Sequence, residues 1–149
     1  MNNKMEKLIS TLNSDLRNEW THLRFYLYHA SAVTGLHCAE LKELFLEEAS
    51  GEMKHVTAFS DMIIGLGGIA TEESNAFPKF EEPIEILNYA IKLEETVVQN
   101  YAQRILEIRE KYEIDDPDAR WIEIFLEDQI QDSRKDVDHL KQLVKGLSR

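Results

Sequence analysis

The segment SGEMKHV, residues 50–56, places Glu52 and His55 three residues apart within a stretch that is typical of one long helix. Residues at that spacing lie on one helical face, and this face also carries Phe45 and Phe59. A carboxylate in an apolar helix seam costs several kcal/mol unless a partner neutralises it. Carboxylate and imidazole groups are ligands of iron and other divalent metal ions, so the motif indicates a metal site.

The other predicted helices also carry polar residues in their apolar stripes. Glu19 lies among leucines, Glu94 lies among aliphatic residues, and the last helix contributes Gln129 and Asp132. Carboxylates from four helices at a similar depth would repel one another, whereas a pair of divalent ions would balance their charge and replace their lost hydration. A midhelix glutamate by itself is usually a surface residue. The combination of all four stripes predicts a di-iron carboxylate site.

Apolar residues at three- and four-residue spacing predict an all-α chain without strands. The four expected helices cover roughly residues 4–34, from Leu41 to the Gly67-Gly68 pair, from Pro83 to the Asp115-Asp116-Pro117 turn, and from that turn almost to Arg149. Glycine pairs and prolines at these boundaries are ordinary helix stops and starts. At 149 residues the chain is expected to form one domain, residues 1–149.

The connection between the second and third helices, from Gly67 to Glu82, is unusually long. A segment of this length can extend over roughly 50 Å, and a thirty-residue helix is about 45 Å long. The connection can therefore pass along a whole helix and make the second and third helices parallel. The sequence thus predicts a four-helix bundle of ferritin-like topology with a long crossover.

Composition excludes several classes of function. The chain has 17 Lys and Arg residues against 28 Asp and Glu residues, and the resulting net charge of -11 disfavours nucleic-acid binding. Cys38 is the single cysteine, so we expect neither a disulfide framework nor a CxxC metal site. No signal-peptide pattern or membrane-spanning run is present, and we expect a cytoplasmic protein without a membrane partner.

Three segments resemble the ferritin superfamily. LFLEEASGEMKHVTAFSDMIIGLGG, residues 44–68, is similar to the second helix of bacterioferritins; NEWTHLRFYLYHA supplies Glu19 and Tyr26; KLEETVVQNY supplies Glu94. The resemblance covers nearly the whole chain. It implies an iron-binding ferroxidase that oxidises Fe(II) with dioxygen or hydrogen peroxide for iron storage or detoxification. Tyr26, as the resemblance implies, would supply an electron or tune the site by hydrogen bonding.

The resemblance also implies how the ligands divide between two iron positions. The first would be bound by Glu19, Glu52 and His55. The second would be bound by bridging Glu52, by Glu94 and by Asp132, with Gln129 nearby. The last helix departs from bacterioferritins, which carry a second Glu-x-x-His there, so the second position would be the weaker one.

Met53, the chain end and the remaining histidines bear on haem binding, assembly and accessory sites. Met53 stands where bacterioferritins bind haem between subunits, on a face with Leu46, Ala49 and Thr57; haem is the minority interpretation beside simple packing. The chain stops about twenty residues after Gln129 without a fifth helix, which favours a miniferritin-like cage among homo-oligomeric cages of 12 or 24 subunits. His22 and His29 are expected on a surface or subunit interface, and His139 in solvent.

Two alternatives stay open. The first is a di-iron or di-manganese oxidoreductase without a storage role, such as a peroxidase or a manganese catalase. The second is a ferritin-like bundle that acts structurally because the part of its metal site near Gln129 and Asp132 has decayed.

Overall fold

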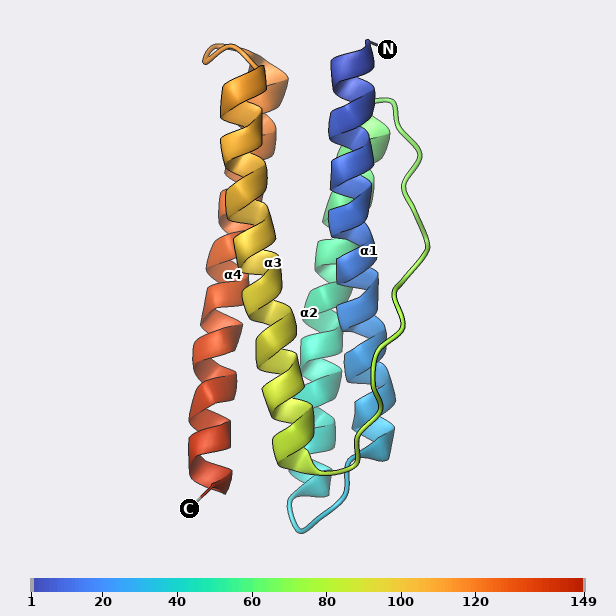
Figure 1. Cartoon of the computed structure of the whole chain (residues 1–149). Coiled ribbons are helices and arrows are strands. Elements are labelled where there is room, and N and C mark those ends of the chain that lie inside the picture. Colours follow the sequence, from blue (N-terminus) through green and yellow to red (C-terminus); the bar gives the residue numbers. More distant parts are fainter. Residues whose placement is uncertain (1, 149) are drawn as a thin grey trace. The chain divides into compact units, whose positions relative to one another are not determined.

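Four helices account for the regular secondary structure of residues 2–148, the part of the chain that the computed structural model describes (Figure 1). They are α1 (Asn3–Ala32), α2 (Cys38–Gly65), α3 (Pro83–Lys111) and α4 (Pro117–Leu147). These bounds confirm the helices expected from the apolar spacing. The predicted end of the last helix near Arg149 lies outside the described residues.

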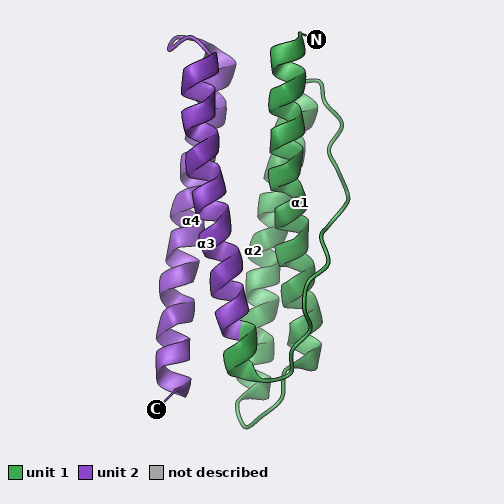
Figure 2. Ribbon diagram, viewed as in Figure 1, with its two compact units in different colours: residues 1–86 green, residues 87–149 purple. Residues whose placement is uncertain are grey.

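The described residues separate into two compact units, one up to residue 86 and the other from residue 87 (Figure 2). The first unit contains α1, α2 and the connection to α3, and the second contains most of α3 and all of α4. The expectation of one domain stays a prediction. None of the helices within residues 2–148 has an apolar stretch long enough to cross a membrane.

α1 and α2 pair in opposite directions through a short turn in the first unit (Figure 1). The Asn2 side chain caps α1 by accepting a hydrogen bond from the amide of Met5. The helix ends two residues earlier than expected because Val33 is extended and the next amide, that of Thr34, bonds the Glu81 carbonyl. The backbone thus leaves α1 to meet the connection rather than to prolong the helix.

The α2 terminus depends on two glycines. Gly67 has φ of 92°, a left-handed conformation that favours glycine, and the Gly68 amide bonds back to the Ile63 carbonyl. A Cβ at Gly68 would lie only 2.6 Å from the Ile9 side chain. The predicted helix stop is therefore also the point where the chain passes closely over α1.

The connection to α3, which we call the crossover (residues 66–82), runs along α1 in the same direction as that helix (Figure 1). Its hydrogen bonds to the first helix are spread from Asn13 to Thr34, just beyond the end of α1. They join Asn13 to Thr71, Trp20 Nε1 to the Thr71 carbonyl, Thr21 Oγ1 to the Asn75 amide, His29 Nε2 to the Phe80 amide, and Thr34 to Glu81. The long connection therefore extends along α1, as its length allows.

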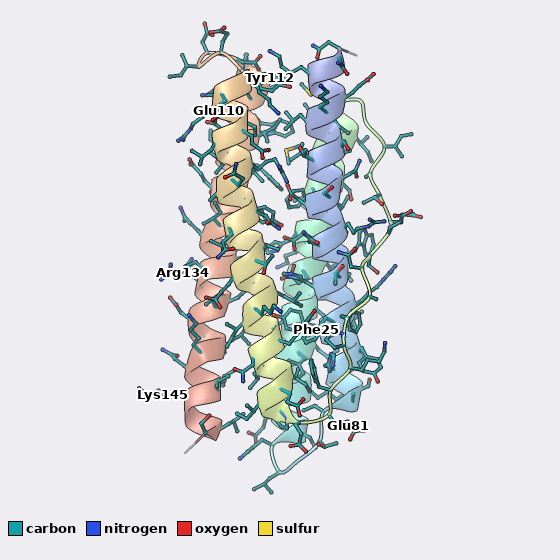
Figure 3. The ribbon with its side chains drawn as sticks, in the orientation of Figure 1. Phe25, Glu81, Glu110, Tyr112, Arg134 and Lys145 are labelled. Atoms are coloured by element: carbon teal, nitrogen blue, oxygen red, sulfur yellow. The ribbon has the colours of Figure 1, made fainter. Side chains whose placement is uncertain are left out.

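His29 hydrogen-bonds the crossover near its C-terminal end. Its Nδ1 lies 2.8 Å from the Phe25 carbonyl and its Nε2 lies 3.1 Å from the Phe80 amide nitrogen. Because a backbone amide donates, Nε2 must accept, and the neutral tautomer with a proton on Nδ1 satisfies both contacts. Figure 3 labels Phe25 on α1 and Glu81 near the end of the crossover.

His29 is fully buried, so the expectation of a surface or interface position is wrong. The helical pattern assigned one apolar stripe to α1, facing a helix. The crossover covers a second side of α1, and that side includes Thr21 and His29.

The second unit contains α3 and α4 in opposite directions (Figure 2). Asp116 caps α4 through the Ala119 amide, and Pro117 occupies the first turn. Near this end the buried Glu123 carboxylate pairs with Arg120 at 3.2 Å and with Arg109 at 3.5 Å. The turn predicted from Asp115-Asp116-Pro117 is confirmed.

We expect the free energy of unfolding to fall as the pH decreases below about 6.5, in part through His29. Burial lowers the pKa of His29 from 6.5, Lys79 lowers it further, and the bond to the Phe25 carbonyl acts in the opposite direction. As the pH falls, the imidazole of residue 29 therefore takes up a proton in the unfolded chain before it does so in the folded chain. The stability that neutral His29 contributes is present above pH 6.5 and is lost as the pH falls through the lowered pKa.

Urea unfolding of wild type and His29→Gln at pH 7.5 and pH 5.5 measures this contribution. The variant should lose about 1 kcal/mol at pH 7.5 and depend less on pH than the wild type. His139→Gln, at an exposed position, should keep the wild-type pH dependence. An equal pH dependence in all three proteins would contradict the assignment.

Candidate metal-binding site

Ionisable side chains meet between α1 and α2 in the middle of the first unit. Glu19 and His22 lie three residues apart on α1, and Glu52 and His55 have the same spacing on α2. Each pair therefore occupies one helical face. Glu19, His22 and Glu52 are each 1% exposed, and His55 is partly buried.

The contacts among these four side chains are short. His55 Nδ1 lies 3.3 Å from Oε2 of Glu52 and 3.4 Å from Oε2 of Glu19. His22 Nδ1 lies 3.7 Å from the other Glu52 oxygen, Oε1. One ligand atom from each of Glu19, His22 and Glu52 can be chosen so that all three lie within 4.8 Å of one another.

The charges of this cluster compensate one another. Burial opposes ionisation of Glu19, but hydrogen bonds with Glu52 and His55 and the charges of His22 and His55 lower its pKa from 4.5 to about 2. Burial also opposes protonation of His55, yet hydrogen bonds and attraction to both carboxylates raise its pKa from 6.5 to about 11. Without metal, a proton on His55 balances the carboxylates.

The donor chemistry of the cluster fits a divalent transition-metal ion. Carboxylate oxygens and imidazole nitrogens together suit Fe(II), Zn(II) and similar ions. The groups are already gathered and shielded from water, and an ion would take the charge-balancing role of the His55 proton. The structure brings together Glu19, Glu52 and His55 from the predicted ligands.

His22 joins this cluster, so the expectation that it lies on a surface or interface is wrong. The apolar stripe of α1 was centred on Leu23 and Tyr26, which placed His22 to one side of it. His22 is buried because it faces Glu52 of α2, and the crossover bonds the neighbouring Thr21 through the Asn75 amide. The Glu-x-x-His spacing of Glu19 and His22 was the signal that could have identified it.

In the second unit, Glu94 of α3 is 0% exposed and Asp136 of α4 is partly buried. A carboxylate oxygen of each lies within 4.8 Å of the other. Gln129 is also buried, and its Oε1 has no hydrogen-bond partner among the described residues. Glu94 and Gln129 are therefore on buried faces, as predicted from the sequence.

The prediction that Asp132 shares the inward face of α4 is wrong, because Asp132 is exposed. Successive buried positions on α4 are Gln129, Ser133 and Val137, which define the inward face. Asp132 precedes Ser133 by one residue and so points about 100° away from it around the helix. Few apolar residues mark the middle of α4, but the spacing of Ser133, Val137 and Leu140 could have indicated the correct register.

Comparisons with known proteins identify the family of the chain. A family model described as a ferritin-like domain matches residues 9–149. The chain belongs to the ferritin-like family. No curated protein matches the chain.

Three solved structures resemble this ferritin-like domain. A ferritin-like diiron-carboxylate protein from Bacillus anthracis is 27% identical, with 97% of this chain and 99% of that chain covered and a TM-score of 0.85. A bacterioferritin from Rhodobacter capsulatus is 23% identical, with 97% and 87% covered and a TM-score of 0.86. A dodecameric thioferritin from Bacteroides fragilis is 21% identical, with 97% and 92% covered and a TM-score of 0.66.

These likenesses confirm the predicted fold class, an all-α ferritin-like four-helix bundle. In this ferritin-like domain, both Glu-x-x-His motifs lie on α1 and α2, whereas α4 carries buried Gln129 and partly buried Asp136.

Two other predicted residues have clear positions in the ferritin-like domain. Tyr26 is 1% exposed and packs against Phe25 of α1 and Phe45 of α2, with ring centroids 5.7 Å and 6.3 Å away. Met53 is 57% exposed on the outer face of α2 with Leu46, whereas Ala49, expected beside them, is buried. Roles of Tyr26 in electron transfer and of Met53 in haem binding stay predictions.

We expect Zn(II), a redox-inert ion, to raise the melting temperature of the wild type and to raise that of Glu52→Gln much less. An ion that binds only the folded state at a hundred times its Kd adds about 2.7 kcal/mol to the free energy of unfolding. The neutral amide removes the carboxylate that contacts both imidazoles.

The measurement is a thermal melt with and without Zn(II). Glu43→Gln is the matched control, since Glu43 is exposed on the same helix. Equal Zn(II)-induced shifts in all three proteins would place the ion elsewhere.

Proposed function

We propose that this ferritin-like domain is a ferroxidase that oxidises Fe(II), its substrate, for iron storage or detoxification. The observation that carries the proposal is the buried cluster of Glu19, Glu52 and His55 within a chain that belongs to the ferritin-like family. The Bacillus anthracis protein, described as a diiron-carboxylate protein, supports the same kind of site.

Glu19, Glu52 and His55 would bind the first Fe(II). Glu94 and Asp136 would bind the second, with Gln129 buried on the same helix as Asp136, and Asp136 takes the place first given to Asp132 because Asp132 is exposed.

Each Fe(II) gives up one electron. Two electrons and two protons convert one dioxygen to hydrogen peroxide, or one hydrogen peroxide to two waters, and the Fe(III) leaves as mineral. The carboxylates stabilise the higher charge of Fe(III). Tyr26, buried two turns along α1 from Glu19, is proposed to tune this electron transfer.

We expect anaerobic Fe(II) to saturate near two ions per chain and dioxygen or hydrogen peroxide then to oxidise it rapidly. Glu52→Gln and His55→Gln should each slow oxidation at least about tenfold, since both lose a direct ligand. Glu47→Gln, exposed on the same helix, should match the wild type. Stopped-flow absorbance of Fe(III) measures the rate, and oxidation by the wild type no faster than in buffer would overturn the proposal.

We also propose that the chain assembles as a homo-oligomeric cage, supported by the dodecameric thioferritin among its structural relatives. The outer face of α2 offers a subunit contact, because Leu46 and Met53 lie seven residues apart there and are 44% and 57% exposed. Two copies related by a two-fold axis would bring this patch against itself.

Light scattering should therefore give the wild type a mass that is a multiple of 17.3 kDa. Met53→Lys should lower this mass, because it buries a charge in an apolar contact and sets it against its own copy. Lys54→Gln, at an exposed neighbouring position, should leave the mass unchanged. A monomeric wild type would contradict the cage.

A further inference from the structure

His22 has no part in the function proposed above, yet it is one of the most buried polar residues of α1. Its side chain is about 2% exposed, and its Nδ1 lies 3.7 Å from Oε1 of Glu52. His55 approaches the other oxygen, Oε2, at 3.3 Å. Glu52 therefore has an imidazole nitrogen beside each of its carboxylate oxygens.

The position of His22 is set from two directions. α2 places Glu52 in front of it, and the crossover closes the adjacent side of α1 through the bonds of Trp20 and Thr21 to Thr71 and Asn75. An imidazole enclosed in this way loses its hydration, which is compensated when it meets a carboxylate or a metal ion.

We propose that His22 is a direct metal ligand, so that Glu19, His22, Glu52 and His55 bind one divalent transition-metal ion within the α1–α2 pair. Two features support a single ion. Ligand atoms of Glu19, His22 and Glu52 lie within 4.8 Å of one another, and His55 Nδ1 lies within 3.4 Å of both carboxylates. Each Glu-x-x-His motif then gives the ion one carboxylate oxygen and one imidazole nitrogen, so the ion has two oxygen and two nitrogen donors.

This donor set gives the site a metal preference of its own. Imidazole nitrogen favours Fe(II), Co(II) and Zn(II), whereas the oxygen donors Glu94, Asp136 and Gln129 suit harder ions. The nitrogen-rich set is therefore the first to fill with a divalent transition metal. The inference deepens the proposed function, since it assigns the first Fe(II) position a fourth ligand.

The competing role for His22 is to orient Glu52 by a hydrogen bond without touching metal. Loss of affinity alone does not separate the two roles, because removal of an orienting residue also weakens binding. The number of imidazoles on the ion does separate them.

Co(II) is the probe, because it is stable in air at this kind of site and is paramagnetic. Proton NMR of the Co(II)-loaded wild type should show two strongly shifted ring N–H signals that disappear in D2O, one from each histidine. His22→Gln and His55→Gln should each retain one, and His139→Gln should retain both. His22→Gln should also weaken Co(II) binding at least about tenfold by visible absorption.

One shifted N–H in the wild type, or two in His22→Gln, would overturn the inference, as would a wild type that binds no Co(II). Circular dichroism checks that each variant folds. If His22→Gln does not fold, the number of shifted N–H signals in the wild type still tests whether His22 binds the ion. Co(II) binding requires no oxidation of Fe(II). Two N–H signals without Fe(II) oxidation would therefore refute the ferroxidase but support His22 as a ligand. Rapid Fe(II) oxidation with a single N–H signal would support the ferroxidase but refute His22 as a ligand.

Discussion

The burial of two carboxylates side by side, Glu19 on α1 and Glu52 on α2, is the constraint on which the first unit depends. Both are 1% exposed, and in a medium of low dielectric constant they repel each other and lose their hydration. His55 contacts both of them and His22 contacts Glu52, so positive charge is available where the negative charge accumulates. The antiparallel pairing of α1 and α2 places these residues at one level.

The crossover completes that environment. It is long and has no regular secondary structure, which would ordinarily leave its backbone solvated and variable. Here its polar groups bond successive turns of α1, from Asn13 to Thr34. As a result α1 is buried on two sides, and residues outside its apolar stripe, such as Thr21 and His29, become interior residues.

The nitrogen donors are distributed unevenly between the two units. His22 and His55 of the candidate cluster are on α1 and α2, whereas Glu94, Asp136 and Gln129 on α3 and α4 offer carboxylate and amide groups. Imidazole nitrogen suits divalent transition metals, and carboxylate oxygen suits harder ions. The two units therefore differ in the donor chemistry that each offers.

Local sequence patterns alone determined the four helices, their approximate ends and the inward positions of Glu19, Glu52, His55 and Glu94, because apolar periodicity and glycine or proline stops act over a few residues. Tertiary structure decided the rest. His22 is interior because it faces Glu52 on α2, thirty positions away along the chain. Asp132 is exposed, against the prediction, because few apolar residues mark the middle of α4, and packing through Ser133 and Val137 set its rotation.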